Sequence, residues 1–226
     1  TMNDQYDIKC CDVLIENDKI SKINKNIQEK NATVIQGSGK ILIPGFIQTH
    51  LHLCQTGMRN RADDLSLLDW LCKKILPFEM KHTKKTLRHS ATLGLYELIC
   101  SGTTTILDMG TMRHTEELFS AIKESGIRAF AGKCMMDQRA PKGPAFYEST
   151  RNAFRESVQL MERWHGAENG RIHYAFAPRF ALTCSDKLLK MTADICKKEK
   201  IVLHTHASEN KTECELVKKK TGFSNI

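Results

Sequence analysis

The sequence predicts an α/β protein in which repeated strand–helix units build a parallel sheet. Apolar runs of strand length alternate with helical patterns from residue 41 to residue 226. Gly102 and Gly126 stand before two of these strands, where a helix should end. The first 40 residues, in contrast, hold only short alternating segments. Five such units fit either an open parallel sheet or an unfinished eight-stranded barrel.

Residues 1–40 are predicted to form part of a small β-domain. Residues 12–16 read as a strand, and residues 19–23 alternate polar and apolar side chains, as a half-buried strand does. Asn17-Asp18 supplies the turn between them. Residues 32–35 are expected to add another strand.

From residue 41 onward, strands and helices are expected in turn. Apolar side chains recur at helical spacing within residues 87–98, 154–161 and 188–195. The expected strands are 41–47, 103–108, 127–132, 171–177 and 200–206. In both parallel architectures the functional residues gather at the carboxyl ends of the strands.

Composition excludes several classes of protein. The 226 residues are 41% hydrophobic and 27% charged, which is ordinary for a globular chain. The formal charge is +8 and the pI is about 9.0, but the lysines are scattered in pairs and triplets, so we expect a solvated surface and no nucleic-acid partner. No apolar run is long enough to span a membrane and no signal peptide opens the chain, so we expect a cytoplasmic protein.

The cysteines do not indicate a disulfide framework. There are nine of them, an odd number, and no pair has CxxC spacing. We therefore expect reduced thiols, mostly buried, and no structural zinc knuckle.

Two histidine motifs lie at predicted strand ends. His50 and His52 close the run ILIPGFIQTHLHL, and residues two apart in an extended chain point to the same side. His206 lies in HTHASEN, at the end of the fifth expected strand. Neutral imidazoles are ligands for Zn, Fe or Ni, and a catalytic site leaves one position open for water. Taken alone, either motif could also be structural.

Other polar residues stand beside these motifs. Glu209 lies three residues after His206 and could move protons to and from a water at the metal, although it could instead be a first-turn carboxylate of the following helix. His204 reads as a core residue or a neighbour of the ligands. Arg179 and Phe180, in APRF, end the fourth expected strand and are a third signal.

With these residues in hand, the chain resembles the amidohydrolase superfamily. The segments that carry the resemblance are PGFIQTHLHL, ADDLSLLDWL, SGTTTILDMG, ESGIRAFAGKCMMD, APRFALTCS and HTHASEN. They are similar to the branch that holds triazine hydrolases, guanine deaminases, 5′-deoxyadenosine deaminases and methylthioadenosine/S-adenosylhomocysteine deaminases. The resemblance implies a metal-dependent (β/α)₈ TIM-type barrel with an attached β-sandwich. Residues 1–40 would be part of the sandwich, and residues 41–226 the first five β/α units.

The resemblance also implies roles for particular residues. The expected metal ligands are His50, His52 and His206, with Glu209 as proton shuttle. The expected substrate contacts are Gln55, Glu79, Arg179 and Phe180, with Glu79 matching a ribose-binding glutamate. The simpler readings are a salt bridge at the barrel rim for Arg179 and a loop hydrogen bond for Gln55.

The implied function is hydrolytic deamination of an adenosine-like nucleoside or related purine, with one divalent metal ion, Zn or alternatively Fe. The same resemblance leaves guanine deamination or chlorotriazine hydrolysis open, and a non-catalytic scaffold is the alternative of another class. The histidine and aspartate ligands of later family strands would lie beyond Ile226. The chain is therefore expected to be an N-terminal fragment with little activity alone, which forms homo-oligomers or associates through its open barrel edge.

Overall fold

The computed structural model describes residue 5 and residues 7–225, and its chain divides into two compact units, Thr1–Gly45 and Phe46–Ile226. In the first unit, β1 (Asp12–Glu16) pairs antiparallel with β2 (Lys19–Asn24). Asn17 in their two-residue turn has a φ of 59°, a left-handed conformation that asparagine tolerates well. This hairpin matches the prediction.

The strand expected at residues 32–35 is wrong. These residues form no strand, and Val34 and Ile35 are 74% and 84% exposed. Their β-branched side chains suit a pleated sheet only where a neighbouring strand or layer covers them. Within the described part of this unit, β1 and β2 pair only with each other.

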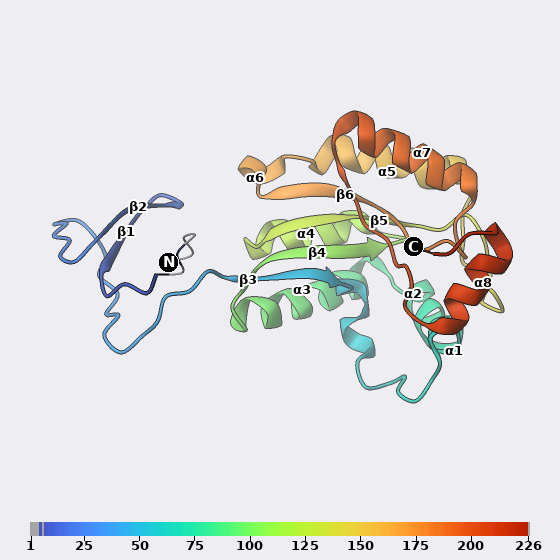
Figure 1. Ribbon diagram of the computed structural model, residues 1–226, viewed down its shortest axis with the longest axis horizontal. Coiled ribbons are helices and arrows are strands. Elements are labelled where there is room, and N and C mark those ends of the chain that lie inside the picture. Colours follow the sequence, from blue (N-terminus) through green and yellow to red (C-terminus); the bar gives the residue numbers. More distant parts are fainter. Residues whose placement is uncertain (1–4, 6, 226) are drawn as a thin grey trace. The chain divides into compact units, whose positions relative to one another are not determined.

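The second unit is a five-stranded parallel sheet with helices along one face (Figure 1). Its strands follow chain order: β3 (Phe46–Leu51), β4 (Thr103–Thr111), β5 (Arg128–Met135), β6 (Ile172–Pro178) and β7 (Val202–Leu203). The connecting helices are α3 (Lys84–Cys100), α4 (Thr115–Ser125), α5 (Thr150–Trp164) and α7 (Asp186–Glu199), and α8 (Lys211–Thr221) follows β7. Because the strand order never reverses, the sheet is part of a barrel and not a doubly wound open sheet.

Shorter elements fill two of the connections: those after β3 lie at the sheet's carboxyl end, and the one before β6 lies at its amino end. They are η1 (Leu53–Met58), α1 (Leu67–Trp70), η2 (Leu71–Ile75) and α2 (Leu76–Met80) after β3, and α6 (Ala167–Gly170) before β6. The long connection between β3 and α3 therefore contains several short helices of its own.

Two expected strands are misplaced. The strand predicted at 41–47 begins only at Phe46, whose backbone N–H donates to the Gly102 carbonyl at 2.9 Å. Pro44 has no backbone N–H to give to a ladder, and Ile41 is 86% exposed ahead of it. The strand predicted at 200–206 is regular only at Val202–Leu203, although single backbone bonds continue beyond it.

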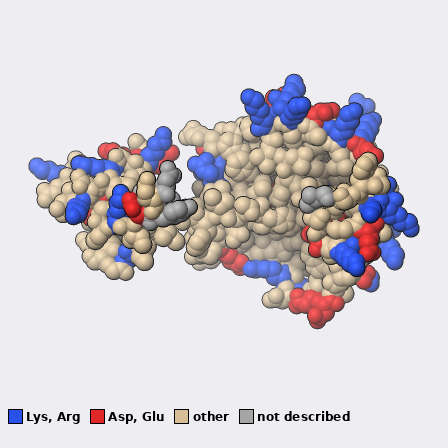
Figure 2. Space-filling view, in the orientation of Figure 1, with Lys and Arg blue, Asp and Glu red and all other residues tan. Residues whose placement is uncertain are grey.

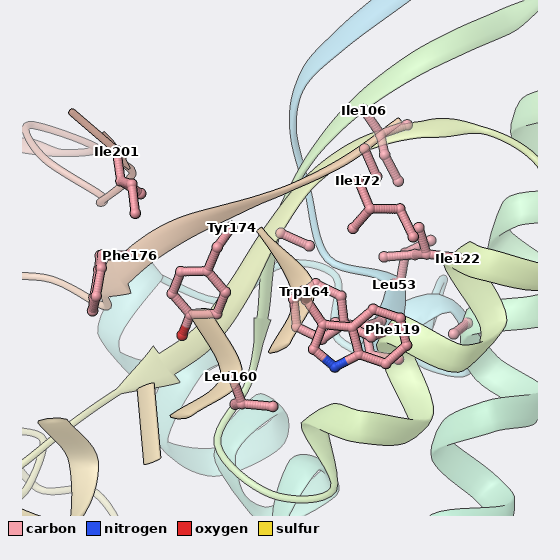
Figure 3. Packing of buried hydrophobic residues seen from close by; sticks show 14 of the residues in the cluster. Leu53, Ile106, Phe119, Ile122, Leu160, Trp164, Ile172, Tyr174, Phe176 and Ile201 are labelled. Atoms are coloured by element: carbon pink, nitrogen blue, oxygen red, sulfur yellow. The ribbon is translucent and has the colours of Figure 1, made fainter. Parts of the chain in front are cut away.

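An aromatic cluster packs the helices against the sheet (Figure 3). Phe119 of α4 stacks on Trp164 of α5, with ring centroids 5.0 Å apart, and lies 6.1 Å from the ring of Tyr174 on β6. The Tyr174 hydroxyl accepts from the Lys133 backbone N–H at 3.1 Å and lies 2.6 Å from the Ser157 hydroxyl. This packing holds β5 and β6 in register, so their carboxyl ends reach the same rim.

The approach of β4 to β5 requires a glycine. Gly110 has a φ of 77°, and a Cβ added there would lie 1.8 Å from the Gly132 carbonyl oxygen. No side chain fits at that distance, so only a glycine at this position lets the end of β4 lie this close to β5.

Charged side chains gather on the helices and leave the middle of the sheet face free of charge in the view of Figure 2. Basic residues close α7 and α8, among them Lys197, Lys198 and Lys218. All nine cysteines are unpaired, and five of them are buried. No helix in the described ranges has the length and apolar character needed to cross a membrane.

Candidate metal centre

Three histidines from two distant segments meet at the carboxyl end of the sheet. His50 lies in β3, His52 follows it, and His206 lies just beyond β7. One ring nitrogen from each falls within 4.8 Å of the others, although His52 and His206 are 154 residues apart in the chain. Parallel strands place both segments at the same rim, and the two-residue spacing turns His50 and His52 to the same side. The structure therefore brings together the three residues expected to bind metal.

Hydrogen bonding fixes which nitrogen of His206 is free. Its Nδ1 lies 2.8 Å from the Arg179 carbonyl oxygen, which can only accept, so Nδ1 carries the hydrogen. The Nε2 lone pair is then exposed, 3.1 Å from Nε2 of His52. Two nitrogens bound at 2.0–2.1 Å to one tetrahedral ion are about 3.4 Å apart, so this separation, which is also within hydrogen-bond range, needs to widen only by a few tenths of an ångström to admit an ion. The backbone N–H of His206 also donates to the Arg179 carbonyl, at 3.0 Å, so the segment itself is anchored.

The electrostatics of the cluster favour neutral imidazoles. Burial lowers the pKa of His206 to about 4 and is the largest cause of a pKa well below the ordinary value at His52, where the Arg179 charge adds to it. Burial also lowers the pKa of His50. Neutral rings keep the lone pairs that metal ions need, so the donor set, its spacing and its protonation fit one divalent cation.

Asp108, which the sequence did not single out, anchors the chain directly after His52. Its carboxylate accepts from the backbone N–H of Leu53 at 2.8 Å and of Gly110 at 2.7 Å. The side chain is fully buried, and burial raises its pKa to about 7. A buried aspartate at the end of the run TTTILD was the signal available in the sequence. Its partners are backbone groups, which no sequence pattern reveals.

A cavity of about 160 Å³ opens beside the histidines. Glu209 stands at its wall, and desolvation is the largest cause of a raised pKa there, with the nearby Glu213 adding to it. Ser208, with a φ of 57°, turns the chain between His206 and Glu209. The lining residues are His50, His52, Leu67, Trp70, Leu71, Arg179, Phe180, His206 and Glu209. Gln55 instead lines an adjoining open pocket of about 620 Å³ that shares His52 and Trp70 with this cavity.

Comparison with known proteins identifies the family of this chain. Residues 41–225 match the amidohydrolase family. The chain belongs to that family. A 5-methylthioadenosine/S-adenosylhomocysteine deaminase of Carboxydothermus hydrogenoformans is 36% identical over 218 residues, which are 95% of this chain and 48% of the relative. A 5′-deoxyadenosine deaminase of Methanobrevibacter smithii is 39% identical over 202 residues, 89% of this chain and 45% of the relative.

Solved structures extend the comparison to the fold. The guanine deaminase of E. coli superposes with a TM-score of 0.66 at 33% identity, over 78% of this amidohydrolase chain and 39% of its own. A triazine hydrolase of Arthrobacter aurescens superposes with a TM-score of 0.89 at 23% identity, over 100% of this chain and 54% of its own, which shows the fold. This chain thus spans about half the length of the curated relatives it matches.

Three of the expected substrate contacts of this amidohydrolase chain form one buried polar cluster. The Arg179 guanidinium pairs with the Glu79 carboxylate through Nη1–Oε2 at 2.7 Å and Nη2–Oε1 at 3.1 Å. Gln55 donates from Nε2 to Glu79 Oε1 at 2.8 Å. Glu79 and Arg179 are each 3% exposed. The cluster ties α2 to the end of β6, and the Arg179 carbonyl in turn holds His206.

Removing one partner of this pair should destabilise the protein strongly. Arg179→Met is expected to lower the free energy of unfolding by about 3–5 kcal/mol, because Glu79 is left as an uncompensated buried charge. The double variant Glu79→Leu/Arg179→Met should lose less than Arg179→Met alone, since no charge stays behind. Urea unfolding of both variants checks this. Equal loss in the two variants would show that the pair does not act as a unit.

Proposed function

We propose that this chain carries the metal-binding site of a hydrolytic deaminase that acts on adenosine-like nucleosides or related purines. The observation that carries the proposal is the convergence of three neutral imidazoles on one point, with a carboxylate of raised pKa on the wall of the same cavity. The amidohydrolase membership supports a hydrolase, and the curated relatives named above are deaminases of methylthioadenosine, adenosylhomocysteine and 5′-deoxyadenosine.

His50, His52 and His206 are proposed to hold one divalent ion, with Zn preferred and Fe as the alternative. When bound, the ion supplies a Lewis acid that activates water near neutral pH. The Arg179 carbonyl keeps His206 Nδ1 protonated, and the Asp108 carboxylate fixes the backbone after His52, so both rings are held before the ion arrives. Preorganised ligands of this kind need little rearrangement on binding.

Glu209 is proposed to move the protons of the reaction. Its carboxylate takes a proton from the attacking water and delivers it to the ring nitrogen next to the amino-bearing carbon, which makes that carbon more electrophilic. A second transfer through the same carboxylate protonates the leaving amine, and ammonia departs. Its raised pKa brings it nearer to neutrality, where a group that both accepts and donates protons is most effective.

Two of the remaining expected contacts, Arg179 and Phe180, line the same cavity. Phe180 is proposed to pack against the heteroaromatic ring, and Arg179 to present its charged edge beside it. Glu79 is proposed to recognise vicinal hydroxyls of a ribose. Because its carboxylate is bonded to Arg179 and Gln55, it would exchange one of these bonds for a substrate hydroxyl.

Guanine deamination is the second candidate, favoured by the 33% identity to a guanine deaminase over most of this chain. A non-catalytic scaffold is the alternative of another class, and the presence of His50, His52, His206 and Glu209 together speaks against it. The unpaired thiols fit a reducing compartment, and we propose the cytoplasm.

A substrate panel tests the proposal. Metal-supplemented protein is incubated with 5′-deoxyadenosine, methylthioadenosine, guanine and a chlorotriazine, and ammonia or chloride release is followed together with the ultraviolet spectrum. The chain is assayed alone and as a chimera in which it replaces the matching half of the Methanobrevibacter smithii relative. Adenosine-like substrates should be deaminated fastest. A folded, metal-loaded chimera that turns over none of the four would refute the proposal, and preference for guanine would select the second candidate.

A further inference from the structure

A fourth histidine lies beside His50, one of the three histidines proposed to bind the ion. His204 is 8% exposed, and its Nε2 lies 2.8 Å from Nδ1 of His50. The two rings meet edge to face, with centroids 4.9 Å apart and planes at 81°. The backbone N–H of His204 donates to the Phe176 carbonyl at 2.9 Å, so the pairing of this segment with β6 sets where the ring stands.

The distance identifies this contact as a hydrogen bond and not as two ligands of one ion. Nitrogens sharing a tetrahedral ion stand about 3.4 Å apart, whereas N–H···N partners approach to about 2.9 Å. Two neutral imidazoles bonded in this way share one hydrogen, carried either by His50 Nδ1 or by His204 Nε2. Only the first arrangement leaves the Nε2 lone pair of His50 free, because a neutral ring carries its hydrogen on one nitrogen.

We propose that His204 is a positioning residue that accepts the Nδ1–H of His50 and thereby presents His50 Nε2 to the metal ion. This inference rests on the proposed role of His50 as a ligand. It gives His50 the same kind of support that His206 receives from the Arg179 carbonyl at 2.8 Å. Outer partners of this type fix the tautomer and orientation of ligating histidines in many metal sites.

The burial of His204 shows that packing alone does not account for a histidine here. In either arrangement its Nδ1 is buried without a hydrogen bond of ordinary geometry, and the Asp108 backbone also interacts with the ring. A buried polar group without such a bond destabilises the folded chain, so an apolar side chain would be more stable at this position. The hydrogen bond to His50 explains why this position holds a histidine, which packing alone does not explain.

Cobalt binding tests the inference without any assay of activity. The wild-type chain, His204→Leu and His204→Gln are titrated with Co²⁺, and affinity and visible absorption are recorded. His204→Leu should bind Co²⁺ about 10–100-fold more weakly, with an altered spectrum. His204→Gln offers an amide oxygen as acceptor and should restore both. The matched control is His173→Leu, which removes a half-buried histidine of β6 bonded to the Gly170 carbonyl; it should bind as the wild type does.

Two outcomes overturn the inference: unchanged affinity and spectrum in His204→Leu, or a loss in His204→Gln as large as in His204→Leu. Nitrogen-15 NMR of the imidazoles in the wild-type chain gives a second reading that needs neither a folded variant nor a metal. A hydrogen on His50 Nδ1 is expected, and a hydrogen on Nε2 would refute the assignment. If the wild type binds no Co²⁺ while His50 is protonated at Nδ1, the three histidines do not suffice as a metal site without further ligands, and the positioning contact stands.

Discussion

Replacing His50 and His52 together by alanine is expected to reduce the metal content of the purified protein from near one ion per chain to background. The two rings supply two of the three converging nitrogens, and one remaining imidazole cannot hold a divalent ion against water. Elemental analysis after dialysis against trace metal measures this directly. No other variant proposed for this chain should lower metal binding more.

The matched control removes two histidines elsewhere. His89 and His165 are both exposed, so His89→Ala/His165→Ala deletes the same number of imidazoles without touching the cluster, and it should keep its metal. Metal retained in the His50/His52 double variant would place the ligands elsewhere. No metal in any of the proteins, the wild type included, would show that these three histidines do not suffice without further ligands.

Glu209→Gln is expected to lower the turnover number at least about a hundredfold, the low end for loss of a general acid–base group. Glutamine keeps the size and hydrogen-bonding capacity of the side chain but cannot carry a proton between water, ring nitrogen and amine. Metal content should stay unchanged, because Glu209 is not one of the three clustered donors. Initial rates are measured on the substrate that the panel selects, with the chimera if the chain alone is inactive.

Glu215→Gln is the control for this variant, since Glu215 is an exposed carboxylate on α8 outside the cavity. It should retain the wild-type rate. A near-wild-type rate for Glu209→Gln would remove Glu209 from the role. Loss of metal together with activity would instead mean that Glu209 helps to hold the ion.

Local patterns were sufficient for most of the fold. The alternation of polar and apolar residues around Asn17-Asp18 predicted the hairpin, and helical spacing predicted α3, α5 and α7. The prediction failed at residues 32–35 and 41–45, where apolar runs without a partner strand or with Pro44 lie exposed outside any strand. Propensity alone cannot say whether a neighbouring strand is present to pair with.

The candidate site, too, could be predicted only in part from the sequence. The two-residue spacing of His50 and His52 and the position of Glu209 after His206 were sufficient to nominate the chemistry, and their roles stay predictions. The hydrogen bonds around these residues could not be predicted from the sequence. The Asp108 carboxylate accepts from backbone N–H groups, and Glu79 pairs with Arg179, which lies 100 residues away in the chain. Each such contact depends on which strand ends share a rim.

By itself, the sequence determined the type of most main elements, the family and the identity of the chemical groups, because these follow from local periodicity and from short motifs. Only the tertiary structure decided that His206 presents Nε2, that Arg179 is neutralised by Glu79, and that His204 lies against His50. A tautomer, an ion pair and a ring contact are set by distances of about 3 Å between segments far apart in the chain, and a linear pattern does not contain those distances.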